Sequence, residues 1–163
     1  AMQSGDLLNV NSISNSMRVS RLKIEEFLNI LEQTFICKRI YPFHKNYSKE
    51  ITKTPKLYFL DLGLRNFILN NFNDLSLRTD KGSLFENFCL TEILSEDYYS
   101  MKKVNFWRTI NKTEIDFIVH SEGKINAIEI KWSNSKRPRS FSSIESLYPE
   151  INTELVTTAK YLM

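Results

Sequence analysis

The sequence predicts a mixed α+β or α/β protein in two parts. The first is a winged helix with a connecting helix (residues 1–72), and the second is an α-β-β-β-α-β unit with a mixed sheet (residues 73–163). Helical periodicity near the N-terminus gives way to two short strand patterns, and the second half sets one long apolar helix before three strand-like runs. A polar, turn-rich stretch at residues 70–81 separates the halves, so we place the domain boundary there.

The first part contains two helix patterns and two strand patterns. Residues 20–33 carry apolar side chains at the i, i+3, i+4 and i+7 spacing of an amphipathic helix, namely Ile24, Phe27, Leu28 and Leu31. Ser20 is its expected N-cap, and a shorter helix at residues 10–19 indicates a helix-turn-helix. Strand patterns at residues 35–43 and 56–60 flank a Lys-rich segment, which predicts a hairpin with a long basic tip, the wing.

A connecting helix is predicted at residues 61–72, with an apolar face formed by Leu64, Phe67 and Ile68. The second part then has the patterns of a helix, three strands, a short helix and a final strand, at residues 83–98, 104–109, 113–120, 124–132, 139–148 and 153–158. Pro149 ends the short helix.

The composition, with 42% hydrophobic and 25% charged residues, is that of an ordinary globular protein. No apolar run approaches the ~18 residues of a membrane span and no signal-peptide pattern is visible, so we expect a cytoplasmic location without a membrane partner. The absence of GxxxxGKS/T and GxGxxG motifs predicts no ATP site in this chain. Cys37 and Cys89 are expected to be buried free thiols, and His44 and His120 are too few for a His-based metal site.

The net charge of +3 belongs to the winged-helix part, because residues 1–55 hold 8 Lys and Arg against 5 Asp and Glu. The wing interleaves its cations with Tyr41, Phe43 and Tyr47, which suits phosphate neutralisation and base stacking, although a solvated wing has the same pattern. DNA is therefore the expected partner. The predicted contacts in the wing are Lys38, Arg39, Lys45, Lys49 and Lys53. A second basic group follows the last strand of the hairpin described next: Lys136, Arg137 and Arg139.

The candidate chemistry lies on the predicted hairpin of the second part. A tight turn at residues 122–123, with glycine where a positive φ is needed, makes facing residues sum to 245. Asp116 then faces Glu129. Glu114 likewise faces Lys131, and because side chains alternate along a strand all four point the same way. The opposite, core-facing side is expected to carry Ile115, Phe117, Val119, Ile128 and Ile130.

Two facing carboxylates destabilise a sheet unless a cation compensates them. Lys131 supplies part of that charge to Glu129, and a hard divalent ion such as Mg²⁺ would supply more. The simpler alternative is a solvated ladder in which Glu114 and Lys131 form an exposed pair worth less than about 1 kcal/mol. Glu86 adds a third acid that interrupts the apolar stripe of its helix, unless it forms a capping box with Ser83.

Glu86, Asp116 and the Glu129-Ile130-Lys131 run, on this order of elements, resemble the PD-(D/E)XK or restriction-endonuclease-like superfamily over residues 81–163. The resemblance implies Mg²⁺ or Mn²⁺ as cofactor, held by Glu86, Asp116, Glu129 and the main-chain carbonyl of Ile130. It also implies that Lys131 is the catalytic lysine, acting with those three carboxylates. Ile115 stands where the name-giving proline would be.

Over nearly its whole length the chain resembles the C-terminal half of prokaryotic AAA+-type ATP-binding proteins of unassigned function, through segments such as KTPKLYFLDLGLRNFIL, GSLFENF, TEIDFIV and AIEIKW. That resemblance implies an N-terminal ATPase domain as a partner. Two functions are consistent with it. One is a Mg²⁺-dependent nuclease that hydrolyses phosphodiester bonds, in DNA first of all. The other is an inactive nuclease-like and winged-helix module that binds DNA or protein and regulates the ATPase.

Overall fold

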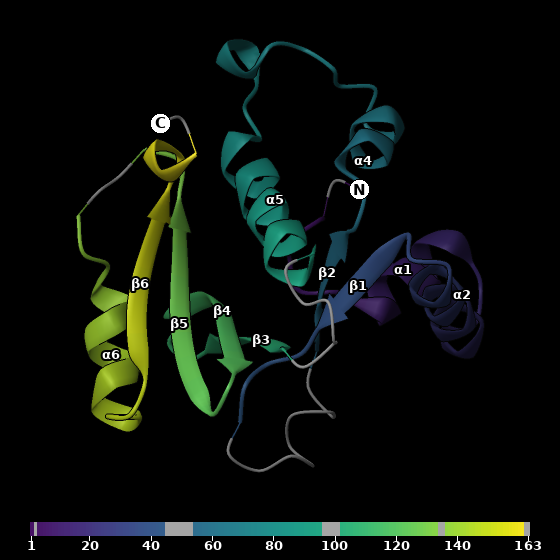
Figure 1. Ribbon diagram of the computed structural model, residues 1–163. Helices are drawn as coiled ribbons and strands as arrows, with labels where there is room; N and C mark the ends of the chain where they lie inside the picture. The colour runs from purple at the N-terminus through teal and green to yellow at the C-terminus, as the bar shows by residue number, and fades with distance from the viewer. Residues whose placement is uncertain (2, 45–53, 96–101, 134–135, 162–163) are drawn as a thin grey trace.

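The computed structural model describes residues 1, 3–44, 54–95, 102–133 and 136–161. Across these residues the protein is a mixed α+β structure with a two-stranded sheet and a four-stranded sheet (Figure 1). The helices and strands follow the order that the sequence predicts. The winged-helix and restriction-endonuclease-like interpretations of that order stay predictions.

The N-terminal part consists of α1 (Val10–Met17), α2 (Arg21–Gln33) and an antiparallel hairpin of β1 (Cys37–Ile40) and β2 (Lys56–Phe59). The predicted N-cap of α2 is confirmed, since the hydroxyl oxygen of Ser20 accepts a hydrogen bond from the backbone N–H of Lys23 at 3.3 Å. Between the two helices the chain reverses at Arg18, which has a φ of 53°. The predicted wing residues Lys45, Lys49 and Lys53 lie outside the described residues.

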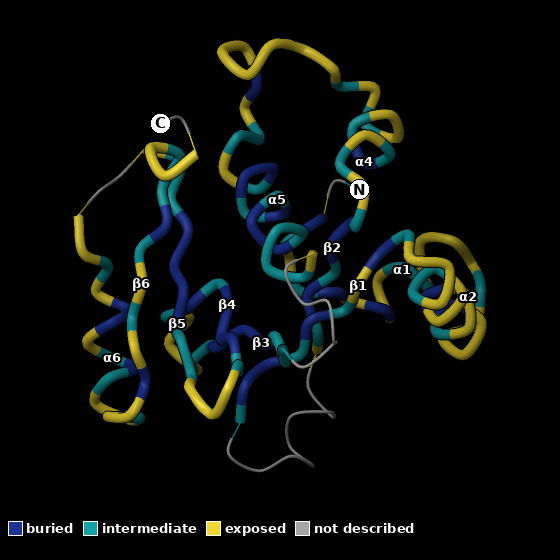
Figure 2. The backbone as a smooth tube through the Cα atoms, in the orientation of Figure 1, coloured by how far each residue is buried: buried dark blue, intermediate teal, exposed yellow. Residues whose placement is uncertain are grey.

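The helix α2 buries a narrower face than its sequence pattern predicts. Ile24 and Leu28 pack with Leu8 and Val10 in a small core of their own. Phe27, expected on the packed face, is 43% exposed. That expectation is wrong because α2 contacts α1 and β1 along one side and leaves the rest of its surface to solvent (Figure 2).

The connecting segment contains α4 (Leu62–Ile68) and the short 3-10 helix η1 (Leu75–Leu77), most of it exposed (Figure 2). The predicted apolar face does not pack against the protein, because Phe67 is 71% exposed and Ile68 is 55% exposed while Arg65 is buried. Arg65 Nη1 lies 3.0 Å from Asp80 Oδ2 at the start of the next helix. This ion pair, rather than apolar packing, sets which side of α4 faces the protein.

The C-terminal part contains α5 (Lys81–Ser95), β3 (Lys103–Arg108), β4 (Glu114–Ser121), β5 (Lys124–Lys131), α6 (Arg139–Leu147), β6 (Asn152–Thr157) and the 3-10 helix η2 (Thr158–Lys160). β3, β4 and β5 are antiparallel neighbours, and β6 joins β5 in parallel. The predicted α-β-β-β-α-β order and mixed sheet are confirmed. The parallel pairing requires a crossover, which α6 provides.

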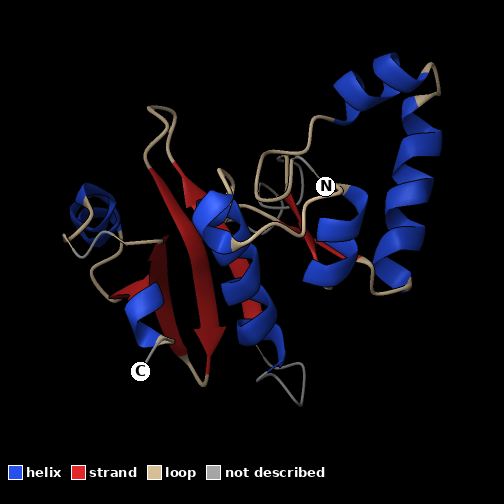
Figure 3. Ribbon diagram, turned by 90° about the horizontal axis from the view of Figure 1, so that it is seen from above, coloured by secondary structure: helices blue, strands red, loops and turns tan. Residues whose placement is uncertain are grey.

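The four-stranded sheet lies between two helices (Figure 3). The α5 core combines helix and sheet side chains: Phe85, Cys89, Leu90, Phe117, Val119, Ile128 and Ile130. The α6 core on the other face contains Phe141, Ile144, Ile115, Ile118 and Ala127. Ile40 of β1 and Tyr58 of β2 belong to the α5 core, so the two parts of the chain share one apolar interior.

Two expectations from composition concern the cysteines and the membrane. Cys37 and Cys89 are buried free thiols, as predicted. Burial raises the pKa of the Cys89 thiol to about 12, which makes it a poor nucleophile near neutral pH. Among the described residues, no helix combines the length and apolar character needed to cross a membrane.

Candidate functional site

The β4–β5 hairpin has the predicted register next to its turn, but the pairing ends at Phe117 and Ile128, so the predicted pairs Asp116–Glu129 and Glu114–Lys131 are not part of the ladder. Residues 117–121 pair with residues 124–128 in antiparallel order, and each pair satisfies the expected sum. The turn residues Glu122 and Gly123 have φ values of 50° and 74°. Two successive positive φ values match the right-handed twist of the strands, so this turn alone sets the pairing.

The strand β4 carries an extra residue where it pairs with β3. Asn105 of β3 pairs with Ile118, whereas Trp107, two residues later, pairs with Ile115, three residues back along β4. This β-bulge interrupts the alternation of side chains along β4. Ile115 therefore packs in the α6 core, and the prediction that it shares a face with Phe117 is wrong.

Asp116 lies at this bulge, half-buried among other acids. Its Oδ2 atom accepts a hydrogen bond from the backbone N–H of Ile130 at 2.8 Å. Removal from water, followed by the charges of Glu86 and Glu129, raises the pKa of Asp116 to about 8. The fold thus brings the three predicted carboxylates into electrostatic contact, and at Ile130 it is the N–H that binds Asp116.

Glu86 reaches this cluster from α5. Tyr58 donates a hydrogen bond from its hydroxyl to Glu86 Oε1 at 2.6 Å. Burial raises the pKa of Glu86, although Lys56 and Tyr58 act in the opposite direction. The capping-box alternative is wrong, because α5 begins at Lys81 and the Ser83 hydroxyl donates to the carbonyl of Asp80.

Lys56 brings a positive charge into the same cluster from β2. Its side chain is 4% exposed, and its Nζ lies 2.5 Å from Glu114 Oε1 and 3.5 Å from Glu86 Oε1. Burial acts to lower the pKa of Lys56, but Glu86 and Glu114 outweigh it and raise the pKa. The alternative in which Glu114 and Lys131 form an exposed pair is therefore wrong, since Glu114 binds Lys56 and, at 2.9 Å, Arg108.

Sequence reasoning placed Lys56 and Tyr58 on a predicted strand and missed their position among these acids. A signal was available in KLYF, because residues two apart on a strand share one face. A face that buries Tyr58 must also bury Lys56, and a buried lysine requires an acidic partner. Which acids it meets cannot be read from the strand.

Glu129 and Lys131 form the neighbouring half of the site. Lys131 Nζ lies 2.7 Å from Glu129 Oε1, which confirms that this lysine compensates that acid. The other carboxylate oxygen of Glu129 accepts a hydrogen bond from the Ser140 hydroxyl of α6 at 3.3 Å. Glu129 is buried, whereas the Lys131 side chain is 42% exposed and can meet a ligand from solvent.

The donor atoms of this cluster fit a divalent ion by chemistry, because carboxylate oxygens are the ligands that Mg²⁺ prefers. Burial is the main cause of the raised pKa values of Asp116 and Glu86, and the neighbouring acids Glu86 and Glu129 add to it at Asp116. Among the described residues, no three His, Cys, Asp or Glu side chains are grouped so that they could hold a metal ion. The Lys56 ammonium lies 3.5 Å from Glu86 Oε1, so a metal ion bound to that oxygen requires Lys56 to move.

Comparison with known proteins assigns the chain to a family. Residues 81–162 match the family described as "Domain of unknown function (DUF4143)", which is half of the chain. The chain belongs to the DUF4143 family. Residues 1–75 match a second one, "Domain of unknown function (DUF8612)". The DUF4143 match contains all four predicted catalytic residues, whereas Lys56 and Tyr58 lie in the DUF8612 match.

Two curated relatives of this DUF4143 protein are the uncharacterized proteins Rv2008c of Mycobacterium tuberculosis and Mb2031c of Mycobacterium bovis. Each is 25% identical over 129 residues, which covers 78% of this chain and 29% of the relative. The chain thus spans less than a third of the length of these relatives. No solved structure matches it.

The predicted wing contacts of the DUF4143 protein divide into two kinds. Lys38 is exposed on β1. Arg39 instead binds Glu25 at 3.0 Å and also binds Glu32, and its side chain is 11% exposed. Arg39 therefore joins the hairpin to α2 and presents little of its guanidinium to a ligand.

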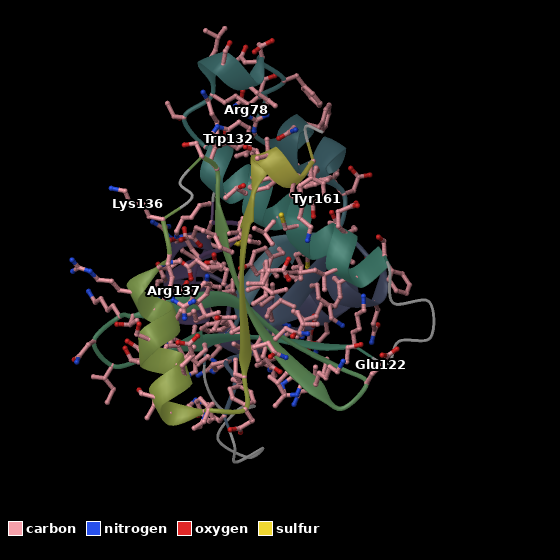
Figure 4. All side chains as sticks on the ribbon, turned by 60° about the vertical axis from the view of Figure 1, so that its left-hand side comes forward. Arg78, Glu122, Trp132, Lys136, Arg137 and Tyr161 are labelled. Carbon is pink, nitrogen blue, oxygen red and sulfur yellow. The ribbon has the colours of Figure 1, made fainter. Side chains whose placement is uncertain are left out.

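The second basic group lies beside α6. Lys136, Arg137 and Arg139 are exposed, and Figure 4 shows the Lys136 side chain directed away from the protein. Arg137 pairs with Glu145 and lies 5.4 Å from the ring centre of Phe141. In the sequence these cations follow β5, the strand that ends at Lys131.

Proposed function

We propose that this chain is a nuclease-like module in which Glu86, Asp116 and Glu129 hold a divalent cation for phosphodiester hydrolysis, with DNA as the substrate. The observation that carries the proposal is Asp116. It is placed by a β-bulge between two further acids, and its pKa is raised to about 8. Bulges that re-aim a side chain and strongly perturbed carboxyl groups are both concentrated at functional sites.

The residues divide the chemistry in a simple way. Glu86, Asp116 and Glu129, with the main-chain carbonyl of Ile130, would hold the ion. Mg²⁺ or Mn²⁺ bound there would polarise the phosphate and make a nearby water more acidic. Lys131, half-exposed beside Glu129, offers its ammonium to the negative charge that develops on the phosphate.

The surrounding charges support a nucleic-acid substrate. Lys136, Arg137 and Arg139 can contact the phosphate backbone next to the carboxylates, and Lys38 can do so from the wing. The length of the relatives supports a larger protein, and the resemblance in the sequence makes an ATPase domain the proposed partner. A cytoplasmic location belongs to the same proposal.

Incubation of supercoiled plasmid with the protein and Mg²⁺ or Mn²⁺ tests this function. We expect cleavage that EDTA abolishes and that falls by about 100-fold or more in Asp116→Asn and Lys131→Ala, because the first removes a ligand of the ion and the second removes the ammonium that faces the developing negative charge. Lys124→Ala, at the exposed start of the same strand, is the matched control and should cleave like the parent. Equal cleavage by all four proteins, or none with either metal, contradicts the proposal.

A second function is favoured by one observation, the ion pairs that Lys56 makes with Glu86 and Glu114. A cluster already compensated by a lysine could serve an inactive module that docks DNA or a protein and regulates the ATPase. That function predicts salt-dependent DNA binding by the parent protein with no cleavage in any metal. Calorimetric titration with Mn²⁺ separates the two, since only the nuclease requires the parent protein to bind the ion.

A further inference from the structure

The carboxylate site is completed by a strand that lies outside the nuclease-like part. Lys56 and Tyr58 sit two residues apart on β2, and both side chains reach Glu86 Oε1, at 3.5 Å and 2.6 Å. Lys56 Nζ also lies 5.5 Å from the ring centre of Phe106, which closes the site on that side. The N-terminal part thus contributes the most deeply placed cation of the cluster.

Lys56 and a divalent ion compete for the carboxylate of Glu86. Both are cations that bind carboxylate oxygen, and Oε1 of Glu86 already accepts the Tyr58 hydroxyl and faces the Lys56 ammonium. A metal at that oxygen would lie within a few ångströms of a buried ammonium, and two like charges so close in a poorly solvated site repel strongly. The two cations therefore exclude one another at Glu86.

We infer that Lys56 is the resident cation of the carboxylate site and that a divalent cation binds at Glu86 only by replacing the Lys56 ammonium. Tyr58 keeps its hydrogen bond and holds Glu86 in place during the exchange. The inference rests on the proposed function only in taking the carboxylates as the place where a divalent ion binds, and it requires no cleavage. It makes β2, and with it the wing hairpin, sensitive to whether the site holds a metal.

Mn²⁺ binding by calorimetry tests the exchange in the full chain. Lys56→Met keeps most of the side-chain volume and removes the ammonium, so we expect Mn²⁺ to bind about tenfold more tightly or better than to the parent protein. Arg108→Met is the matched control. It removes one positive charge that lies 2.9 Å from Glu114 Oε2, on the same acid that Lys56 binds, and it leaves Lys56 in place. We expect it to change the affinity by no more than about threefold, as for a partly exposed pair.

Equal gains in Lys56→Met and Arg108→Met would overturn the inference, because they would reflect net charge alone. If Lys56→Met does not fold in EDTA, its refolding in Mn²⁺ is the second measurement. Recovery of the native circular dichroism spectrum with Mn²⁺ supports the exchange, and failure to fold with and without Mn²⁺ overturns it. Because the readouts are binding and folding, a parent protein that cleaves no DNA would count against the proposed function and leave this inference standing.

Discussion

Two clusters of buried charge link segments of this protein, and they are built in opposite proportions. In the first, Arg65 and Arg78 both bind Asp80, at 3.0 Å and 2.8 Å, where the connecting segment meets α5. In the second, Lys56 forms ion pairs with Glu86 and Glu114, and Asp116 lies close enough to interact electrostatically with Glu86 and Lys56. The first cluster sets two cations on one acid, and the second sets one deeply placed cation among several acids.

The pKa values follow that difference. Hydrogen bonds from Arg78, and then from Arg65, hold the pKa of Asp80 well below its ordinary range. Burial, and then the charges of Glu86 and Glu129, instead raise the pKa of Asp116 to about 8. Compensated charge joins segments and has no need of a ligand, whereas uncompensated acid carries a free-energy cost that a bound cation can remove. The ratio of cations to acids therefore distinguishes the structural cluster at Asp80 from the candidate site at Asp116.

Asp80→Asn should have the larger effect on stability. It leaves two buried guanidinium groups without their acid, so we expect the free energy of unfolding to fall by about 3 kcal/mol. Asp61→Asn is the control, because Asn replaces Asp well at the N-cap of α4. Urea unfolding at pH 7 measures both. A loss for Asp80→Asn no greater than that of the control would mean that the arginine cluster is not what holds α4.

The second largest effect should be a loss of the stabilisation by Asp80 as the pH falls. Its folded-state pKa is lowered, so its contribution is fully present above the ordinary pKa of 3.8 and is lost as the pH falls below that value. The difference between the urea midpoints of the parent and Asp80→Asn should therefore stay nearly constant from pH 7 to pH 5 and narrow from there down to pH 2, with most of the change below pH 3.8. A difference that stays constant down to pH 2 would show that the Asp80 carboxylate charge is not the source of the stabilisation.

Asp116→Asn should have the smallest effect, and with the opposite sign. In EDTA at pH 7.5 the amide still accepts the Ile130 N–H while removing one acid from the cluster, so we expect stabilisation by about 2 kcal/mol. Asp74→Asn, on the exposed η1 turn, is the matched control. Thermal unfolding monitored by circular dichroism checks the result. Destabilisation by Asp116→Asn in EDTA would mean that the cluster is already balanced, and the contrast between the two regions would disappear.

Several features could be predicted from sequence because their causes are local. The register of β4 and β5 next to their turn depends on two turn residues and on strand alternation, and it is confirmed for residues 117–121. The cap at Ser20 depends on one hydroxyl and an N–H three residues on, and it was correct too. The bulge could not be predicted, because it depends on how β3 pairs with β4, and it moved Ile115 to the other core.

The sequence alone is sufficient for the order of helices and strands, for the pairing of residues 117–121 with residues 124–128, and for the choice of Glu86 as a third acid. Each depends on residues close together in the chain. The folded protein adds the contacts between residues that are far apart in the sequence. Tyr58 meets Glu86 across 28 residues, and Arg65 turns inward to reach Asp80 across 15. Burial is a property of contacts between segments, so the cation that enters an acidic cluster is chosen only when those segments pack together.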